Sequence, residues 1–285
     1  MTPGHRCPPV VVEATLLPWL LVALAPMNRT RVKELLRSGR VLVNGTSTTR
    51  HDCVVNVGDD VIIAKERPKP PDLAILYEDE SLIAIDKPSG LLTVATESEK
   101  DETAFVRLAS VLEKRGDGRP FVVHRLDRGT SGVLLFARSA EDREAIQRGW
   151  DSVEKTYLAI AEGTPKPPEG RIENFLIEGG NLRVRTVSTP SNGAKRAVSR
   201  YRVLRSRSSL SLIEVAIETG RKHQIRVHLA GLGCPIIGDA DYGAQTDPAR
   251  RLGLHAWKLA LRHPRHGGRI ELEAKLPEEL QRIMS

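Results

Sequence analysis

The 285 residues are enough for one large domain and a small one, and an apolar content of 40% allows a substantial core. Aromatic residues make up only 4%, which argues against a broad aromatic platform for stacked bases. Lys and Arg outnumber Asp and Glu by 43 to 36, and the net charge of +7 favours an anionic partner, most commonly nucleic acid. Cys7, Cys53 and Cys234 lie far apart, which argues against a disulfide framework or a zinc site, so we predict no metal.

The first compact unit is predicted at residues 12–65, after a loose extension. Its apolar run Leu16–Ala25 has the length and small-residue ending of a secretory signal and is too short to span a bilayer. Because Glu13 precedes the run and the next segment needs a packing partner, we expect a helix in a cytoplasmic protein instead. Pro18 either kinks this helix or lies in the first turn of a shorter helix that starts near Thr15.

A second helix is predicted at residues 31–37, capped by Asn28 or Thr30, with apolar residues at helical spacing. Short strands should follow at residues 41–43 and 60–64. Five basic residues crowd the helix and its ends: Arg29, Arg31, Lys33, Arg37 and Arg40. They form either an ordinary solvated helix face or a set of contacts to nucleic-acid phosphates.

The segment 66–72 contains three prolines in four positions, which favours an extended linker, so a second domain is expected at 73–285. A hairpin is predicted at 73–77 and 82–86. Further strands are predicted at 121–123, 132–137, 156–161, 182–187, 197–204 and 210–218, and helices at 103–115, 139–150 and 222–232. Because the strands mostly do not alternate with helices, the pattern indicates an α+β fold with a mixed, largely antiparallel sheet and flanking helices.

Two stretches of the second domain carry candidate chemistry. In the first, His124–Gly132, Asp127 lies between Arg125 and Arg128 at a glycine-rich turn that opens an apolar strand. In the second, Glu218–His228, residues Arg, His and Gln are dense where a strand passes into a helix. Each stretch alone is also compatible with surface ion pairs or an exposed helix face.

Together these stretches resemble the RluA-type pseudouridine synthases over about residues 73–285. The matching blocks are Asp86–Leu92, His124–Ala137, Lys155–Tyr157, Glu218–His228, Pro235–Gly243 and Leu254–Ala256. The resemblance implies an isomerase that converts uridine in RNA to pseudouridine without cofactor or metal. Its N-terminal unit resembles the small alpha-L RNA-binding domain of a ribosomal protein, whose basic helix lies against structured RNA.

The resemblance also implies roles for individual residues. Asp127 would be the catalytic aspartate, acting as nucleophile or as base, and Arg226 would pair with it. Tyr157 would stack on the uracil and help to remove the proton from carbon 5. The remaining residues of these blocks would contact substrate: Lys87, His124, Arg125, Arg221, His223, Gln224 and His255.

Three alternatives stay open. Large-subunit ribosomal RNA is the expected target by family analogy, with transfer RNA as an alternative. An RNA N-glycosidase would use the same carboxylate but admit water, and a non-catalytic factor would use only the basic surface to bind structured RNA. We expect a monomer that has no membrane partner.

Overall fold

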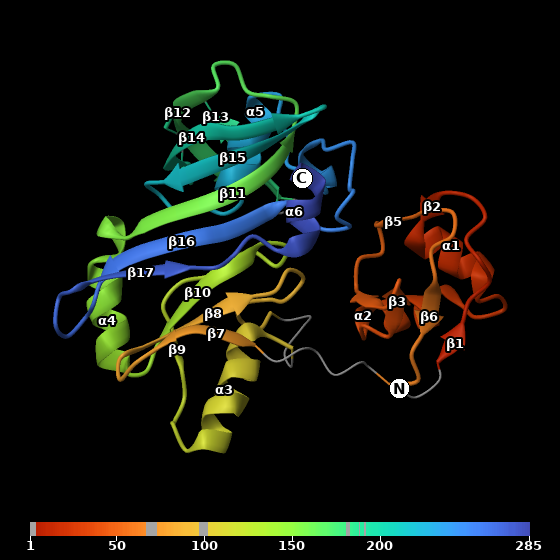
Figure 1. The fold of residues 1–285 in the computed structure, drawn as a ribbon, viewed down its shortest axis with the longest axis horizontal. Coiled ribbons are helices and arrows are strands. Elements are labelled where there is room, and N and C mark those ends of the chain that lie inside the picture. The colour runs from red at the N-terminus through yellow and green to blue at the C-terminus, as the bar shows by residue number, and fades with distance from the viewer. Residues whose placement is uncertain (1–3, 67–72, 97–101, 181–182, 188, 191) are drawn as a thin grey trace. The chain divides into compact units, whose positions relative to one another are not determined.

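The computed structural model describes residues 4–66, 73–96, 102–180, 183–187, 189–190 and 192–285. The chain divides into two compact units, Met1–Asp72 and Leu73–Ser285 (Figure 1). The linker predicted at 66–72 lies, apart from Glu66, outside the described residues. No helix in these ranges is both long and apolar enough to cross a membrane.

The first unit combines two helices with short antiparallel strands. The unit consists of helices α1 (Leu16–Ala23) and α2 (Arg29–Arg37), a four-stranded sheet and a two-stranded sheet. The larger sheet has the order β1 (His5–Arg6), β6 (Val61–Ile63), β3 (Val41–Val43), β4 (Thr46–Thr48), and β2 (Ala14–Thr15) pairs with β5 (Val54–Val55). Leucines of the apolar run, including Leu16 and Leu20, are buried in the core of this unit, as a packed helix requires.

Three local expectations for this unit can be checked. Pro18 lies in the first turn of α1, the second of the two alternatives, where its missing N–H breaks no helical bond. The Asn28 side chain caps α2 by accepting a hydrogen bond from the Arg31 N–H at 2.9 Å. The prediction of a loose extension before residue 12 was wrong for the described residues. Strand β1 pairs with β6 as an edge strand of the sheet, and Cys7 is buried.

The second unit is built on one extended sheet, whose order is β13-β12-β14-β15-β11-β16-β10-β8-β7. The strands, in chain order, are β7 (Ala74–Glu78), β8 (Leu82–Lys87), β10 (Ser131–Ala137), β11 (Glu154–Glu162), β12 (Glu169–Glu178), β13 (Val184–Val187), β14 (Lys195–Arg207), β15 (Leu210–Ile217) and β16 (Leu254–Arg262). Strands β9 (Phe121–Val122) and β17 (Arg269–Glu273) pair beside this path. Among the named strands of the described residues only β10 and β16 pair in parallel, which confirms the largely antiparallel α+β fold.

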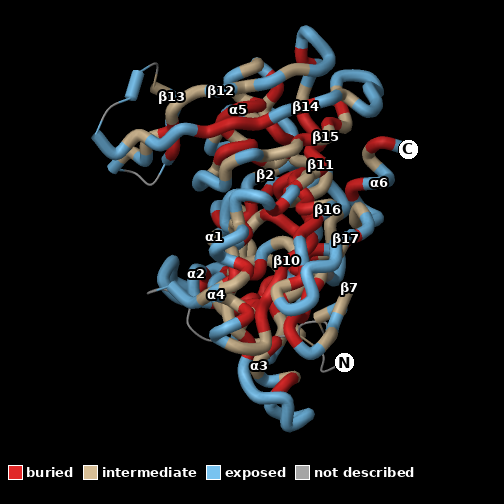
Figure 2. Tube along the Cα trace, turned by 90° about the vertical axis from the view of Figure 1, so that its left-hand side faces the viewer, coloured by how far each residue is buried: buried red, intermediate tan, exposed pale blue. Residues whose placement is uncertain are grey.

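Helices cover both faces of this sheet. On the face of Ile213 and Val215, α5 (Gln224–Gly231) packs through Ile225 and Leu229. Because neighbouring strand residues point to opposite faces, Leu210 and Leu212 of β15 lie on the other face, where they contact α6 (Glu278–Met284). Helix α3 (Ala104–Arg115) begins at the Thr103 cap and α4 (Ala140–Arg148) at the Ser139 cap, both as predicted. Buried segments concentrate in the central strands β10, β11 and β16 (Figure 2).

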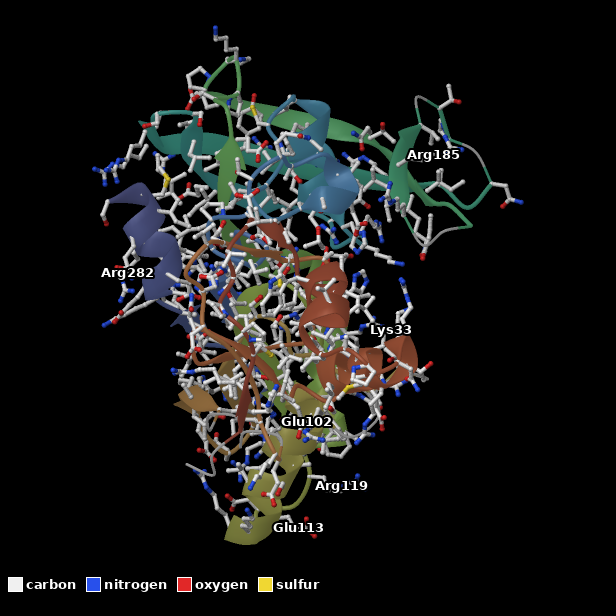
Figure 3. The ribbon with its side chains drawn as sticks, turned by 90° about the vertical axis from the view of Figure 1, so that its right-hand side faces the viewer. Lys33, Glu102, Glu113, Arg119, Arg185 and Arg282 are labelled. Atoms are coloured by element: carbon white, nitrogen blue, oxygen red, sulfur yellow. The ribbon has the colours of Figure 1, made fainter. Side chains whose placement is uncertain are left out.

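Strands β12, β16 and β17 and helix α6 were not predicted from the sequence. The segment that forms β12 alternates charged with apolar side chains only weakly, and most of its residues remain partly exposed. At the edge strand β13, Arg185 projects into solvent (Figure 3), and a charged side chain at such an edge discourages pairing with another chain. Strand β14 is longer than expected because its first residues also pair with β12 and its last residues with β15.

Candidate functional site

Asp127 lies on the loop between β9 and β10, and a neighbouring loop fastens this segment through backbone groups. The Gly90 N–H donates to the Arg128 carbonyl at 2.8 Å, and the Ser89 hydroxyl donates to the Gly129 carbonyl at 2.7 Å. The buried Thr93 hydroxyl both donates to the Leu126 carbonyl at 2.9 Å and accepts from the Leu126 N–H at 3.0 Å. These bonds satisfy the loop's backbone and fix the position of the carboxylate that follows.

Lys87 was predicted to contact substrate, but its buried side chain helps to hold this loop. Its side chain is 0% exposed, and its Nζ donates to the carbonyls of Pro88 (3.0 Å), Leu91 (2.7 Å) and Arg128 (3.3 Å). Burial, reinforced by the Arg251 charge, lowers the pKa of Lys87 to about 7, while the carboxylate of Asp127 opposes the shift. Lys87 therefore helps to hold the Asp127 loop in place through its hydrogen bond to the Arg128 carbonyl.

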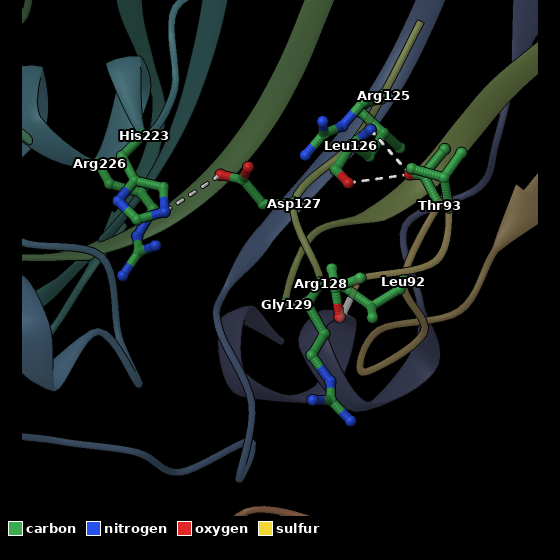
Figure 4. Close-up of a pocket in the computed structure, with 11 residues that line it drawn as sticks. Leu92, Thr93, Arg125, Leu126, Asp127, Arg128, Gly129, His223 and Arg226 are labelled. Carbon is green, nitrogen blue, oxygen red and sulfur yellow. Dashed lines mark hydrogen bonds and ion pairs between the residues drawn. The ribbon is translucent and has the colours of Figure 1, made fainter. Parts of the chain in front are cut away.

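A pocket of about 230 Å³ opens beside the carboxylate of Asp127. One wall comes from residues 92–96, and another comes from His223 and Arg226 at the start of α5. Asp127 Oδ2 lies 4.0 Å from His223 Nε2, and Figure 4 shows the carboxylate directed at the imidazole. Tertiary structure thus brings the two chemical stretches of the sequence together at one pocket.

The junction between β15 and α5 aims His223 at this pocket. His223 has a φ of 54°, in the left-handed region, which histidine adopts more readily than most residues. The next residue, Gln224, is buried: its Oε1 accepts from the Thr219 hydroxyl and the Arg221 N–H, and its Nε2 donates to the Val198 carbonyl. Gln224 thus holds the turn together, and its expected substrate contact is corrected to this structural one, because every polar atom is engaged inside the fold.

Arg226 lines the same pocket, but its direct partner differs from the expectation. Its Nε and Nη2 donate to the two carboxylate oxygens of Asp239, each at 2.7 Å, and Nη2 also contacts Asp241 at 3.3 Å. The side chains of Arg226 and Asp239 are 11% and 1% exposed. These bonds outweigh the cost of burial and raise the pKa of Arg226, with the Asp127 charge contributing. Arg226 therefore acts on Asp127 through its field, while Asp239 orients it.

Two of the expected substrate-binding histidines have structural partners. His255 is buried, its Nδ1 is 2.8 Å from the Ser131 hydroxyl and its Nε2 is 3.0 Å from the Ala274 carbonyl. The Nε2 of His124 accepts from the Leu135 N–H at 3.0 Å, and burial lowers the pKa of His124 to about 3. Both rings are neutral and tie β10 to its neighbours, so neither reaches the pocket as expected of a substrate ligand.

The remaining expected residues are placed around the site. Arg125 is exposed and lines the pocket on the side away from His223 (Figure 4). Arg221 is exposed, and its Nε donates to the Arg196 carbonyl at 3.0 Å. Tyr157 on β11 packs against two of the hydrophobic core clusters and is not among the residues that line the pocket; burial together with the Asp127 charge raises the pKa of its hydroxyl. Tyr157 is therefore neutral and close enough to Asp127 to feel its charge.

Three residues of the site were not singled out from the sequence. Thr93 clamps the Asp127 loop, Asp239 orients Arg226, and the Tyr242 hydroxyl lies 2.8 Å from His223 Nδ1. The guanidinium carbon of Arg226 also lies over the Tyr242 ring, 4.8 Å from the ring centroid. For Asp239 and Tyr242, the sequence signal is the polar cluster Asp239–Gly243, which the resemblance includes only within the block Pro235–Gly243.

Comparison with known proteins identifies the family of this chain. The family described as RNA pseudouridylate synthase matches residues 81–231. A Bacillus subtilis protein named as an uncharacterized RNA pseudouridine synthase, YlyB, is 31% identical over 271 residues, covering 90% of this chain and 88% of the relative. Ribosomal large subunit pseudouridine synthase D of Zymomonas mobilis is 32% identical over 284 residues, covering 90% and 88%.

A solved structure shares the fold of the second unit. Human RNA pseudouridylate synthase domain containing 4 is 30% identical, with a TM-score of 0.61, over 74% of this chain and 92% of that one. The family match includes the pocket wall at residues 92–96, the Asp127 loop and the start of α5, all of which line the pocket. The chain therefore belongs to the RNA pseudouridine synthases, isomerases that act on uridines of RNA.

Proposed function

We propose that Asp127 is the catalytic carboxylate and that it acts on a uridine extruded from its stack into the pocket beside it. The observation that supports this most is that one carboxylate, one imidazole and three arginine side chains line a pocket of about 230 Å³. Asp127 is partly exposed there, so a ribose can reach it. Extrusion of a base costs a few kcal/mol, and exposed Arg125 at the rim is placed to fill the vacated stack or hold the backbone.

The reaction needs few groups because it is an isomerisation. The bond between C1′ and N1 breaks, the uracil turns, C5 joins C1′, and the proton lost from C5 is balanced by the proton gained at N1. Asp127 assists either as a nucleophile toward the ribose or as a base that removes a ribose proton; both routes need an ionised carboxylate at the sugar.

Tyr157 and Arg226 complete the proposed chemistry. The raised pKa keeps the phenol of Tyr157 protonated at rest, so it packs against the base as a neutral ring. It can take up the C5 proton only while it passes its own hydroxyl proton on to an acceptor. The two bonds from Arg226 to Asp239 use Nε and Nη2, which leaves the Nη1 amino group for an acceptor in the pocket.

Substitution of Asp127 tests this assignment. Asp127→Asn should abolish pseudouridine formation and change RNA affinity little, because the amide is isosteric but is a poor nucleophile and base. The exposed Asp151→Asn in the same unit is the matched control and should retain full turnover. Residual turnover in Asp127→Asn, mapped chemically at single-nucleotide level, would refute the assignment. Release of free uracil would favour an N-glycosidase instead.

We further propose that the target lies in large-subunit ribosomal RNA and that the first unit is an alpha-L type RNA-binding domain. The Zymomonas relative is named a ribosomal large subunit pseudouridine synthase, which supports the first proposal. Helix α2 presents basic side chains on its exposed side, which supports the second. Arg31 is engaged with Glu34 at 2.6 Å, and the Nε of Arg40 donates to the Ala64 carbonyl. Three exposed side chains remain for phosphate contacts: Arg29, Lys33 and Arg37.

Two experiments test the target. Pseudouridine mapping of all RNA from a strain lacking this gene should show a missing site in large-subunit ribosomal RNA; a missing site in transfer RNA would establish the alternative. Replacing Arg29, Lys33 and Arg37 by Gln should lower the magnitude of the salt slope of ribosomal RNA binding by about 2 to 3. An unchanged slope would exclude α2 from the RNA interface.

A further inference from the structure

His223 stands between Asp127 and Tyr242. Its Nε2 is 4.0 Å from Asp127 Oδ2, and its Nδ1 is 2.8 Å from the Tyr242 hydroxyl. The Tyr242 hydroxyl in turn accepts a hydrogen bond from the Val184 N–H at 3.0 Å. A chain of polar contacts therefore runs from the backbone of β13 through a phenol and an imidazole to the carboxylate.

These contacts determine which ring nitrogen carries the proton. The Val184 N–H already occupies one lone pair of the Tyr242 oxygen, and the phenol has a single hydrogen to donate. Within the described residues, His223 Nδ1 is the acceptor within reach of that hydrogen. Nδ1 is then unprotonated, so the proton of the neutral ring sits on Nε2, the nitrogen that faces Asp127.

The surroundings keep this ring neutral. Burial, followed by the charge of Arg226, lowers the pKa of His223, although Asp127 opposes the shift. A neutral donor can hold a carboxylate in place without neutralising it, whereas an imidazolium would weaken its nucleophilicity. The distance of 4.0 Å is longer than a hydrogen bond, and such bonds at active sites commonly shorten when the substrate binds.

Resting on the function proposed above, we infer that His223 is a positioning residue for Asp127: its Nε2–H orients the carboxylate toward the ribose, and Tyr242 fixes the tautomer that makes this possible. The turn supports this arrangement, since the hydrogen bonds of Gln224 hold the chain where His223 takes its positive φ. Tyr242 thus acts two contacts away from the reacting atoms.

Four variants separate this role from substrate binding. His223→Gln places an amide N–H near the former Nε2, while His223→Asn suits the positive φ but is too short to reach Asp127. We expect His223→Asn and His223→Ala to lower kcat about tenfold, the value of one hydrogen bond to a charged group, with KM within about twofold. His223→Gln should restore most of kcat. Tyr242→Phe keeps the ring beneath Arg226 and should lower kcat in the wild-type background but not in His223→Gln.

The outcomes are distinct. Failure of His223→Gln to rescue, or an equal loss from Tyr242→Phe in both backgrounds, would overturn the inference, as would a raised KM at unchanged kcat, which would make His223 an RNA contact. Long-range proton–nitrogen NMR on ¹⁵N-histidine wild-type protein gives a test without any variant. It should show His223 protonated at Nε2, and a proton on Nδ1 would contradict the proposal. Wild-type protein that forms no pseudouridine would refute the proposed function instead.

Discussion

The buried Lys87 should give this protein a stability that rises as the pH increases above neutrality. Its pKa is about 7 in the folded chain, against an ordinary value of 10.5. Between these values the unfolded chain binds the additional proton, so the free energy of unfolding increases with pH. Below about pH 7 both states are protonated and the cost of burying the charge is present in full; above about pH 10.5 that cost has disappeared.

The magnitude follows from the size of the shift. One differentially bound proton changes the free energy of unfolding by about 1.4 kcal/mol for each pH unit. Between pH 7.5 and 9.5 the Lys87 contribution is therefore about 2 to 3 kcal/mol. Lys87→Met keeps a similar length and removes the titrating group, so this part of the pH dependence should vanish. It also leaves the carbonyls of Pro88, Leu91 and Arg128 without their donor, which should lower stability at pH 9.5, where wild-type lysine is neutral in the fold.

Urea denaturation at pH 7.5, 8.5 and 9.5 measures the effect. Trp150 and Trp257 report on the second unit, so a Trp19→Phe background removes the signal of the first unit. Titration of all other groups is common to both proteins and cancels in the difference between wild type and Lys87→Met. If that difference is the same at all three pH values, Lys87 does not titrate in this range, and the argument from burial fails.

Two further substitutions test the packing around the site. A Cβ added at Gly132, where φ is +110°, would lie 2.1 Å from the Ala256 carbonyl oxygen on the parallel strand, so Gly132→Ala should cost more than about 2 kcal/mol in chemical denaturation. Gly231→Ala meets no atom within 4 Å and should stay within about 1 kcal/mol of wild type; equal losses would show that the close approach is not the cause. Asp239→Asn sets an amide N–H against the Arg226 guanidinium and should destabilise by about 3 kcal/mol, lowering kcat with it; a change below about 1 kcal/mol would mean that the buried pair is dispensable.

Local chemistry determined much of the fold directly from the sequence. The caps at Asn28, Thr103 and Ser139 begin helices where their side chains accept a backbone N–H three residues on. Strand β10 was recognisable because its buried apolar run is continuous. Asp127 could be predicted as a candidate site residue from an equally local pattern, an acid between arginines at a glycine-rich turn. Each of these signals is complete within a few neighbouring residues.

Tertiary structure alone decided which side chains face the pocket. Lys87 and Gln224 were predicted to contact substrate, yet they are enclosed because distant backbone carbonyls surround Lys87 and the Thr219–Arg221 turn encloses Gln224. Arg226 pairs with Asp239, since α5 and the segment that follows it fold back on one another. Sequence spacing carries no information about such contacts: the polar groups within reach of a side chain are set by how sheet and helices pack, and a residue's protonation and partner depend on that enclosure.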